Sequence, residues 1–584
     1  MVYRLYTKRG DMKNLEVAKV LYAIAEILEM KGEDFKPRAY QKAARSIESM
    51  SEDVEELYKK GKLKDIPGVG EHIALKIEEL IKTGKLKYYE DLKKEMPVNV
   101  EELSGVAGLG PKRIMVLYKK LGVKNLKDLK KAAEEHKIQK LEGFGEKVEE
   151  EILEGIEFVK KKSGRFLLGY IMPEAEEIKN YLSELKSVKQ IEIAGSYRRR
   201  RETIGDIDIL VTSNKPNEVI SRFISMKDID SVLAKGVTRS TIRLKTGLQV
   251  DVRVLKDSEY GSALQYFTGS KDHNIELRKI ALKKGLTLSE YGLFKLRDNK
   301  LVAGKTEEEV YKKLGLDYIP PEIRENKGEL VAASNGKLPK LIEEKDVVAD
   351  LHMHSTWSEG GNTIDEMVVA ALKAGRKVIA ITDHVGQIGV TNPLDEKRLI
   401  QQAKFIDKLN KSYEKQGLRI LKGAEVDILK NGRLALSRAA QAKLDIVLGS
   451  VHLATKMPAK EMTARIVKAL ENDRVHVLAH PTGRLLNERE PYAYDFARVC
   501  EAAKANDVFM EINAFPDRMD LSGENVRTAK EIGCKFSIGT DAHSIEHLKF
   551  LKFGVYMARR GWLERKDVLN AWSVKEIERS LRRK

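Results

Sequence analysis

Three aspartates, Asp206, Asp208 and Asp251, have the order and spacing of a metal site that acts on phosphate groups. Each lies in an apolar, β-branched run, which predicts two strands. Alternation along a strand points Asp206 and Asp208 to the same face, and a neighbouring strand would add Asp251 beside them. Two Mg²⁺ or Mn²⁺ ions held by such carboxylates can activate an attacking hydroxyl and stabilise a leaving pyrophosphate. The pattern therefore predicts a two-metal site for nucleotidyl transfer.

A glycine-serine pair followed by arginines precedes the acids, in the segment Gly195-Ser196-Tyr197-Arg198-Arg199. The amide, hydroxyl and guanidinium groups of such a turn are suited to binding a triphosphate. An Asp-x-Asp pair alone is common at solvated strand ends. The turn and the third acid, in this order along the chain, favour the catalytic interpretation.

Histidines mark a second constellation beyond residue 346, where short apolar runs repeatedly end in histidine or an acid. These residues are His352, His354, His384, Glu425, His452, His480, Asp541 and His543. Repeated strand–helix units with functional groups at the strand ends predict a parallel α/β barrel with its site on one face. Imidazole combined with carboxylate suits Zn²⁺, Mn²⁺ or Fe²⁺ and is typical of phosphoesterase centres with several metals.

The first third of the chain has helical periodicity and contains three related Gly-x-Gly turns, each before a helix with basic residues. They are Gly68-Val69-Gly70, Gly108-Leu109-Gly110 with Lys112 following, and Gly143-Phe144-Gly145. This is the helix-hairpin-helix pattern. Its glycines allow close approach to a phosphate, and the helix N-terminus offers free N–H groups. Such turns bind the DNA backbone without reading its sequence.

Composition agrees with a nucleic-acid partner. The chain has 584 residues, enough for several domains, and a formal net charge of +17 that favours a polyanion. Only Cys500 and Cys534 are present, which indicates a reducing cytoplasm rather than a disulfide framework. No long apolar run or signal-peptide pattern is found, so neither secretion nor a membrane span is expected.

The order of these features resembles a DNA polymerase beta-like core joined to a PHP domain, as in bacterial and archaeal family X DNA polymerases. The resemblance implies a multidomain protein with helical N-terminal helix-hairpin-helix domains, an α+β nucleotidyltransferase palm with a thumb, and a C-terminal α/β PHP barrel. The expected boundaries are 1–90 (lyase-like), 91–155 (fingers-like), 156–262 (palm), 263–325 (thumb), 326–345 (linker) and 346–575 (PHP).

The resemblance also implies roles for individual residues of the front half. Asp206, Asp208 and Asp251 would bind the palm metals, with Asp251 polarising the primer hydroxyl. Ser196, Arg199 and Gly205 would hold the triphosphate, and Arg165 is a looser candidate. Tyr266 and Phe267 would form the floor of the sugar pocket, and Asn274 and Arg278 would touch the nascent base pair. Lys76 falls on the family's Schiff-base lysine, although a solvated lysine is the alternative. Arg200 stands where the family commonly has glycine.

In the PHP half the family's metal ligands fall on His352, His354, Glu359, His384, Glu425, His452, His480, Asp541 and His543, for up to three Mn²⁺, Zn²⁺ or Fe²⁺ ions. Two positions depart from the family pattern. Glu359 replaces the usual aspartate, and Phe515 replaces a residue that is often polar.

The implied function is a monomeric DNA polymerase that fills gaps in base excision repair, using dNTPs on gapped or primed double-stranded DNA. The PHP domain would add a 3′→5′ exonuclease and an abasic-site endonuclease. The main alternative is a small-molecule phosphatase fused to a DNA-binding module. A non-catalytic repair scaffold and template-independent transfer onto RNA or small molecules are further alternatives.

Overall fold

The computed structural model describes residues 14–33, 35–50, 53–104, 106, 109–162, 164–386 and 391–582. The chain divides into two compact units: residues 1–163 with 487–489, and residues 164–486 with 490–584. No helix among the described residues combines the length and the apolar character needed to span a lipid bilayer.

The first unit is entirely helical where it is described. Its helices are α1 (Asn14–Met30), α2 (Lys36–Ser49), α3 (Val54–Lys59), α4 (Glu71–Thr83), α5 (Lys87–Glu95), α6 (Val100–Leu103), α7 (Pro111–Leu121), α8 (Leu126–Glu134) and α9 (Glu146–Lys162), with a 3₁₀ turn η1 (Leu63–Asp65). Val17, Leu21, Ile24 and Leu28 recur at helical spacing on α1 and are all buried. The helices bury these apolar stripes in one hydrophobic core that extends from Val17 to Ile156.

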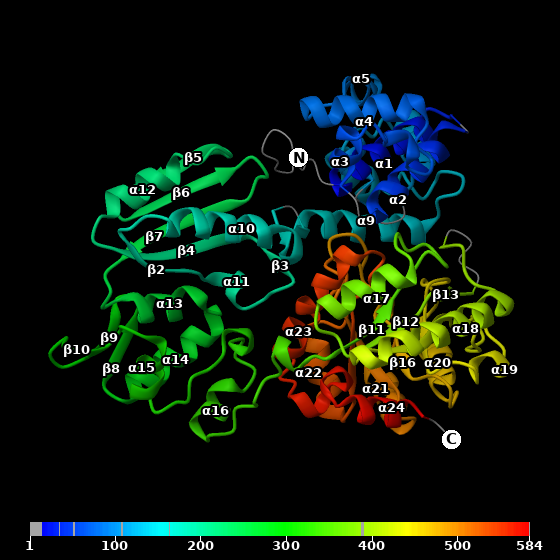
Figure 1. Cartoon of the computed structure of the whole chain (residues 1–584). Coiled ribbons are helices and arrows are strands. Elements are labelled where there is room, and N and C mark those ends of the chain that lie inside the picture. The colour runs from blue at the N-terminus through cyan, green and yellow to red at the C-terminus, as the bar shows by residue number, and fades with distance from the viewer. Residues whose placement is uncertain are drawn as a thin grey trace. The chain divides into compact units, whose positions relative to one another are not determined.

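The second unit begins with the palm. Its elements are β1 (Phe166–Leu167), α10 (Leu168–Ser183), β2 (Val188–Ile193), α11 (Gly195–Arg198), β3 (Thr203–Ile204), β4 (Asp206–Ser213), α12 (Pro216–Ile224), β5 (Ile229–Lys235), β6 (Arg239–Leu244), β7 (Gln249–Leu255) and α13 (Tyr260–Thr268). The sheet has the order β2-β4-β7-β6-β5, and only the β4–β7 pair is parallel. Helices α10 and α12 pack on it (Figure 1).

The thumb follows as a small α+β layer. It contains α14 (Lys271–Lys283), β8 (Leu286–Ser289), β9 (Gly292–Lys295), β10 (Leu301–Ala303), α15 (Glu307–Lys313) and η2 (Pro321–Ile323). The segment expected to be a linker carries helix α16 (Glu329–Ser334). Leu330, Ala333 and Leu341 from this segment are buried in the same core as thumb residues, because an apolar helix face gains stability by leaving water. The segment is therefore packed structure and not a free tether.

The C-terminal part is a parallel barrel, coloured from green to red in Figure 1. Its strands are β11 (Ala349–Met353), β12 (Val378–Ile381), β13 (His384–Val385), β14 (Arg419–Asp427), β15 (Ile446–Ser450), β16 (Val477–Leu478), β17 (Phe509–Asn513) and β18 (Phe536–Gly539). They follow the order β11-β12-β14-β15-β16-β17-β18, with β13 extending the edge of β14. A bridge between Met353 and Ala542 connects the first strand to the segment after the last. The barrel is nearly closed, as the sequence predicts.

Helices surround these strands. They are α17 (Ile364–Lys373), α18 (Glu396–Tyr413), α19 (Arg438–Gln441), α20 (Ala459–Leu470), α21 (Phe496–Ala505), α22 (Gly523–Ile532), α23 (Leu551–Arg560) and α24 (Val574–Leu581), with 3₁₀ turns η3 (Glu344–Asp346), η5 (Glu414–Gln416), η6 (Ile545–Phe550), η7 (Arg565–Asp567) and η8 (Leu569–Ala571). Every residue of β11, β12, β15, β17 and β18 is buried. This explains their continuous apolar runs, since strands covered on both faces do not alternate with polar residues.

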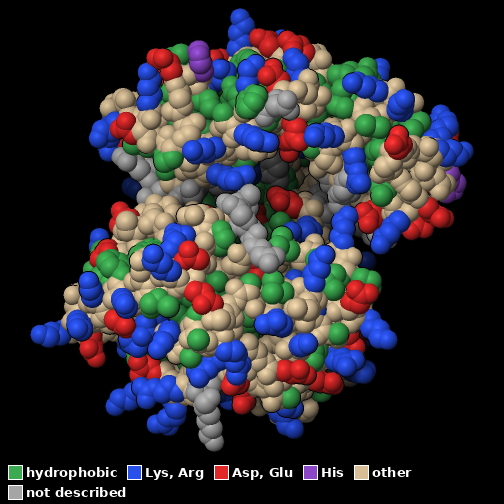
Figure 2. Space-filling view, turned by 90° about the vertical axis from the view of Figure 1, so that its right-hand side faces the viewer, with side chains coloured by type: hydrophobic (Ala, Val, Ile, Leu, Met, Phe, Trp, Pro, Cys, Tyr) green, Lys and Arg blue, Asp and Glu red, His purple; other side chains and the backbone are tan. Residues whose placement is uncertain are grey.

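Basic side chains are spread over the molecular surface. On the face shown in Figure 2, Lys and Arg side chains lie among Asp and Glu side chains and do not form one isolated patch. On this face the positive charge is therefore not concentrated in one place.

Candidate active sites: an aspartate triad and a histidine-carboxylate cluster

The palm sheet brings the three predicted aspartates together. Strands β4 and β7 pair in a register that sets Asp208 directly beside Asp251, and Asp206 lies two residues earlier on the same strand. Asp251 is buried, and its carboxylate accepts hydrogen bonds from Thr241 Oγ1 at 2.6 Å and Gln249 Nε2 at 2.9 Å. These bonds fix the orientation of Asp251 while Asp206 remains exposed to solvent.

Burial and, after it, mutual repulsion destabilise the ionised carboxylates of this triad. Burial, together with the charges of Asp206 and Asp251, raises the pKa of Asp208 to about 7. Burial and Asp251 also raise the pKa of Asp206, although Arg165 acts against them. A site in which carboxylates destabilise one another is relieved by bound cations, and oxygen ligands suit Mg²⁺ or Mn²⁺. The donor set therefore fits divalent cations.

The glycine-serine turn lies against this triad. Gly195 has a φ of +64°, and a Cβ at this position would lie 3.0 Å from Asp208 Oδ2. The backbone is held there because Ala194 N donates to Asp208 O at 2.7 Å. Only glycine satisfies both the left-handed backbone and the close approach. Ser196 follows in α11, and Gly205 lies beside the Arg165 guanidinium.

Arg199 is engaged by other protein groups. Its Nε lies 3.2 Å from Glu325 Oε1, and its Nη1 donates to Thr268 O. Arg560 of α23 also contacts Glu325, at 3.1 Å, and donates to the carbonyl of Arg199 at 2.8 Å. A triphosphate at Arg199 would have to compete with Glu325 for the guanidinium, so the predicted role of Arg199 stays a prediction.

The aromatic pair and the nascent-pair residues form a connected group. Tyr266 and Phe267 meet edge to face, with ring centroids 5.1 Å apart. Asn274 Nδ2 donates to Tyr266 O at 2.7 Å, and Arg278 Nε donates to Asn274 O at 3.3 Å. Arg253 stacks on Phe267 at 4.4 Å. The structure thus places all four predicted residues in contact around the end of α13, with Tyr266 and Phe267 half-buried, Asn274 buried and Arg278 exposed.

The barrel brings the predicted PHP ligands together at the carboxyl ends of its strands. Three groups of side chains place their ligand atoms within 4.8 Å of one another: His354, Glu359, His384 and His543; His352, His354 and Asp541; and His384, Glu425 and His452. His480 joins them through Glu425, with Nε2 2.8 Å from Oε1. All nine predicted residues therefore belong to one cluster.

Several atoms of this cluster lack partners. His354 Nδ1, His480 Nδ1 and Glu359 Oε2 are buried and have no hydrogen-bond partner. Buried polar atoms are almost always satisfied, and a crowd of histidines and carboxylates with unsatisfied atoms fits metal coordination. This donor set could hold metal ions.

The charges of the cluster act in both directions. Burial lowers the pKa values of His352, His452 and His543, but neighbouring carboxylates outweigh it, raising that of His352 well above its ordinary value and those of His452 and His543 to about 9. These three imidazoles must lose a proton before they bind metal. Burial raises the pKa of Glu425, but His384, His452 and His352 outweigh it and hold that pKa far below its ordinary value. Burial and Arg518 lower the pKa of His480 to about 4, so its imidazole is neutral at pH 7. Ionised carboxylates and neutral imidazoles are the forms that bind metal.

Carboxylates behind the ligands orient the imidazoles, and the sequence analysis did not find them. Glu511 on β17 is fully buried and accepts from His352 Nδ1 at 2.6 Å and from His480 N at 2.6 Å. Asp427, two residues after Glu425 on β14, lies 2.8 Å from His452 Nδ1. Both residues could have been found in the sequence as acids within apolar strands that are expected to be buried, because a buried charge needs a partner.

A further buried acid holds the loop that carries Glu359. Asp383 accepts from Ser355 N at 2.7 Å, from Ser358 Oγ at 2.6 Å and from Gln402 Nε2 at 2.5 Å. This loop places Glu359 Oε1 2.8 Å from His384 Nε2 and 3.0 Å from His543 Nε2. Glutamate at this position therefore reaches the cluster despite its extra methylene.

Comparisons with known proteins agree with this geometry. Family models match residues 12–86 (helix-hairpin-helix domain), 100–157 (SAM-like helix-hairpin-helix tandem), 172–262 (DNA polymerase beta palm), 263–325 (DNA polymerase beta thumb) and 350–515 (PHP domain). The DNA polymerase/3′-5′ exonuclease PolX of Bacillus subtilis (strain 168) is 40% identical over 575 residues, covering 98% of this chain and 100% of that protein. The chain belongs to the PolX family of DNA polymerases. Both the predicted family and the predicted fold class are confirmed.

A shorter part of this chain also has relatives of a different kind. A probable phosphatase of Thermoanaerobacter sp. (strain X514) is 32% identical over 209 residues, covering 34% of this chain and 79% of that protein. A probable phosphatase of Vibrio parahaemolyticus is 28% identical over 242 residues, covering 38% of this chain and 89% of that protein. These matches cover 34% and 38% of the chain, so the phosphatase alternative leaves most of the chain unaccounted for.

The departures from the family pattern have structural explanations. Arg200 has a φ of +54°, a conformation that glycine adopts without strain. Its guanidinium stacks on Tyr197 at 5.3 Å and on Tyr556 at 4.7 Å, contacts that glycine could not make. Phe515 packs edge to face on His547 and on Phe550, at 5.1 and 5.4 Å. Phe515 therefore extends an aromatic cluster.

The helix-hairpin-helix turns have the expected backbone where they are described. Gly68 has a φ of +85°, and a Cβ there would lie 2.8 Å from Lys42 Cγ. Gly70 and Gly110 are the N-caps of α4 and α7, with open space around both. Lys112 is exposed in the first turn of α7. Gly108 lies outside the described residues.

The third turn has more acidic residues at its helix N-terminus than the other two, because α4 has only Glu71 in its first turn and α7 has none. Helix α9 begins with Glu146 and has Glu149 in its first turn. Glu149 is buried and accepts from Ile138 N at 2.9 Å and Gln139 N at 3.0 Å. Negative side chains at a helix N-terminus repel phosphate, so this turn is less suited to DNA than the first two.

Lys76 has an environment suited to a nucleophilic amine. Its Nζ lies over the Tyr88 ring at 4.6 Å and donates to His72 O at 3.3 Å. Partial burial lowers the pKa of Lys76 from its ordinary value, although Glu79 acts against this. A lowered pKa increases the fraction of free amine at neutral pH.

Proposed function

We propose that this chain is a DNA-directed DNA polymerase that fills gaps during DNA repair, and that its PHP domain is a metal-dependent 3′→5′ exonuclease. The observation that carries the polymerase is the register of β4 on β7, which sets Asp208 beside Asp251. The full-length likeness to the PolX of Bacillus subtilis supports both activities. The cluster of histidines and carboxylates in the barrel supports the nuclease.

In the palm, Asp206, Asp208 and Asp251 would hold two divalent ions. When bound, these ions would lower the pKa of the primer 3′-hydroxyl and neutralise the leaving pyrophosphate. Thr241 donates to Oδ1 of Asp251 and Gln249 to Oδ2, and Arg239 Nη2 lies 3.2 Å from Oδ1, so the carboxylate is held in place and would exchange some of these contacts for a bound metal. Gly195 and Ser196 would bind the triphosphate through backbone and hydroxyl groups. Arg199 would join them after releasing Glu325.

In the barrel, the nine ligands would hold up to three Mn²⁺, Zn²⁺ or Fe²⁺ ions. These ions would supply a nucleophile at neutral pH and neutralise the scissile phosphate. Glu511 and Asp427 keep His352 and His452 in fixed tautomers and orientations. Arg518 lies 3.5 Å from Asp541 Oδ2 and would neutralise a phosphate oxygen bound beside that ligand.

The substrates that fit these sites are gapped or primed double-stranded DNA and dNTPs. Gly68, Gly70, Gly110 and Lys112 would contact DNA phosphates without reading base sequence. We expect the protein to act as a monomer. Cys500 and Cys534 are free and buried, in keeping with a role in a reducing cytoplasm.

One assay separates the two activities. Asp208→Asn in a labelled primer-template reaction with Mg²⁺ and dNTPs should abolish extension and leave shortening of the primer in Mn²⁺ intact. Asp541→Asn should do the opposite. The exposed Asp230→Asn, on β5 of the same palm sheet, is the matched control and should change neither rate. Extension at the wild-type rate in Asp208→Asn would refute the palm assignment.

A second activity is favoured by the environment of Lys76. We propose that its amine forms a Schiff base with an abasic site and acts as a lyase. Borohydride should trap a covalent complex with abasic DNA in the wild type but not in Lys76→Ala. Lys82→Ala, on the same helix and paired with Glu78, is the control and should trap normally. Equal trapping in Lys76→Ala would exclude this role. Abasic-site incision by the barrel is a separate proposal, tested with Asp541→Asn.

A further inference from the structure

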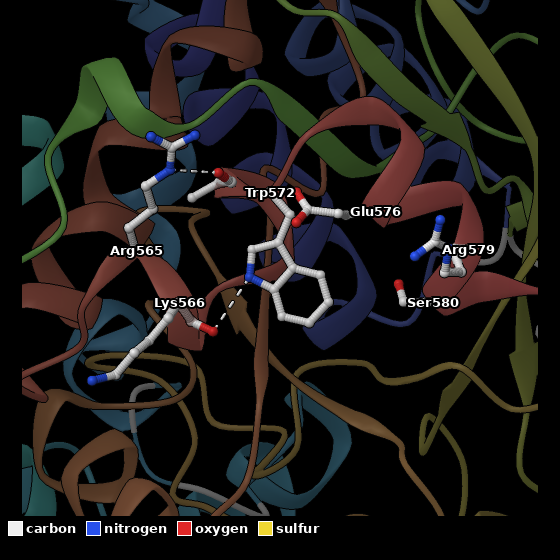
Figure 3. A pocket seen from close by; sticks show the side chains of 7 residues that line it. Arg565, Lys566, Trp572, Glu576, Arg579 and Ser580 are labelled. Carbon is white, nitrogen blue, oxygen red and sulfur yellow. Dashed lines mark hydrogen bonds between the residues drawn. The ribbon is translucent and has the colours of Figure 1, made fainter.

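A hollow of about 660 Å³ lies on the barrel domain, apart from the metal cluster. Its lining includes Arg565, Lys566, Trp572, Glu576, Arg579 and Ser580, all from the last segment of the chain (Figure 3). Three cations and an indole ring thus share one surface depression.

The hollow is at the opposite end of the barrel from the metal cluster. Turn η8 crosses the amino ends of the strands, where Asn570 Nδ2 donates to Ala349 O at 2.9 Å and to Ile538 O at 2.7 Å. Ala349 begins β11, whereas His352 and His354 lie at its other end. Residues at the amino end of such barrels ordinarily contribute to stability and not to catalysis. The exposed cations here therefore need another explanation.

The cations of the hollow are available to a ligand. Arg565 Nε donates to Ala571 O at 2.9 Å, which fixes the guanidinium and leaves its terminal nitrogens without a partner among the described residues. The Arg579 guanidinium has no hydrogen bond or ion pair with a described residue, and its charge and that of Arg565 act on Glu576 at longer range. Lys566 Nζ contacts Glu564 at 2.6 Å and retains further donor capacity. These groups are suited to binding phosphate oxygens.

The acid in the hollow is already occupied. Glu576 closes the capping box of α24 by accepting from Ser573 N at 2.8 Å and Ser573 Oγ at 2.6 Å. These bonds lower the pKa of Glu576, so it stays ionised and committed to the helix N-terminus. The lining carries three cations against this one carboxylate, so a net positive charge remains.

Trp572 provides a fixed aromatic surface. Its Nε1 donates to Lys566 O at 3.3 Å, and its ring meets Phe509 edge to face at 6.0 Å. Figure 3 shows the indole between Arg565 and Arg579. Proteins that bind single strands without sequence preference combine cations that follow the backbone with aromatic rings on which bases stack.

We propose that this hollow binds single-stranded DNA, with a base stacked on Trp572 and the adjoining phosphates held by Arg565 and Arg579. A duplex keeps its bases paired and stacked, so it cannot offer one to an indole in a depression. A nucleotide bound at this end of the barrel is remote from the metal cluster. The site therefore holds a part of the strand that is distant from the 3′ end that is cut. This role rests on the proposed function in one respect, which is that the ligand is DNA.

The test uses the full-length protein and a labelled oligothymidylate of about 30 nucleotides in EDTA, where metal-dependent cleavage cannot occur. Affinity is measured by fluorescence anisotropy at several salt concentrations. Losing two phosphate contacts should reduce the log–log salt slope of Arg565→Ala/Arg579→Ala by about 1.4, since each contact to a single strand contributes about 0.7. The control is Lys575→Ala, which removes a positive charge from α24, the helix that carries Arg579. Lys575 does not line the hollow, so this variant should leave the slope unchanged within experimental error. An unchanged slope in the double variant, or an equal change in Lys575→Ala, overturns the proposal.

A second measurement tests the stacking. The oligothymidylate should quench tryptophan fluorescence in the wild type, and Trp572→Phe should lose that quenching while it keeps an aromatic ring against Phe509. Thymidine monophosphate and inorganic phosphate are tested at equal nucleotide concentration. Quenching by the monophosphate as strong as that by the oligomer would mean a mononucleotide site and would overturn strand binding. Primer extension on a short primer-template should be equal in all variants, so a failure of this inference is distinct from a failure of the polymerase assignment.

Discussion

Replacing Glu511 by glutamine tests whether the carboxylate behind the histidines controls the nuclease. Glu511 is fully buried, and its two oxygens accept from His352 Nδ1 and His480 N, each at 2.6 Å. A glutamine of the same shape has only one accepting oxygen. Its amide NH₂ would face one of these N–H donors, so one hydrogen bond is lost and a donor is left buried without a partner.

The magnitude follows from those two bonds. Loss of a hydrogen-bond partner behind a metal-bound histidine typically costs about 10- to 100-fold in metal affinity or activity. At about 1.4 kcal/mol for each tenfold change, this equals about 1.4–2.7 kcal/mol of barrier or binding free energy. We expect Glu511→Gln to lower the rate of 3′-end shortening by that factor and to lower the bound transition metal measured by elemental analysis. Primer extension should be unchanged, because the palm triad is on a different sheet.

The control for this experiment is Glu501→Gln, which changes an exposed glutamate on α21. It should leave nuclease rate, metal content and extension at wild-type values. Shortening at the wild-type rate with full metal content in Glu511→Gln would refute the reasoning, because the geometry of His352 would then not depend on this carboxylate. A loss of extension equal to the loss of shortening would also refute it, since it would indicate general unfolding.

Three further results are expected. Tyr266→Ala should raise ribonucleotide incorporation relative to deoxyribonucleotide in single-nucleotide kinetics, because the ring would no longer exclude a 2′-hydroxyl; an unchanged ratio would make Tyr266 a packing residue. Lys112→Ala should reduce the log–log salt slope for gapped duplex DNA by about 0.9, equally for different sequences, whereas a sequence-dependent change would contradict backbone binding. Glu307→Gln should lower the free energy of unfolding, measured by urea titration, by about 3–5 kcal/mol, because it leaves Arg324 and Arg198 without their carboxylate partner. The control Glu308→Gln changes an exposed glutamate and should change the free energy of unfolding little. Burial raises the pKa of Glu307, but Arg324 and Arg198 outweigh it and lower that pKa to about 2, so this stabilisation is present above pH 4.5 and is lost as the pH falls towards 2.

Much of the candidate chemistry could be predicted from local sequence. Asp206 and Asp208 lie on β4, and His352 lies on β11 with His354 directly after its last residue; alternation alone predicts each pair on one face. The repeated apolar runs predicted a parallel barrel because strands buried on both faces need no polar alternation. The turns could be predicted from their glycines, because a positive φ or a close approach of the backbone excludes other residues.

Tertiary structure alone decided which distant groups meet. His352 and Glu511 are 159 residues apart, and no local pattern relates them; the closure of the barrel brings β11 and β17 side chains into one interior. The same holds for the pairing of Arg199 with Glu325 and for the stacking of Arg200 on Tyr556. Sequence periodicity fixes the face on which a side chain lies, because it follows from the backbone geometry of a single element. Register between strands and contacts between domains depend on how all the buried surfaces pack together, and that packing is a property of the whole fold.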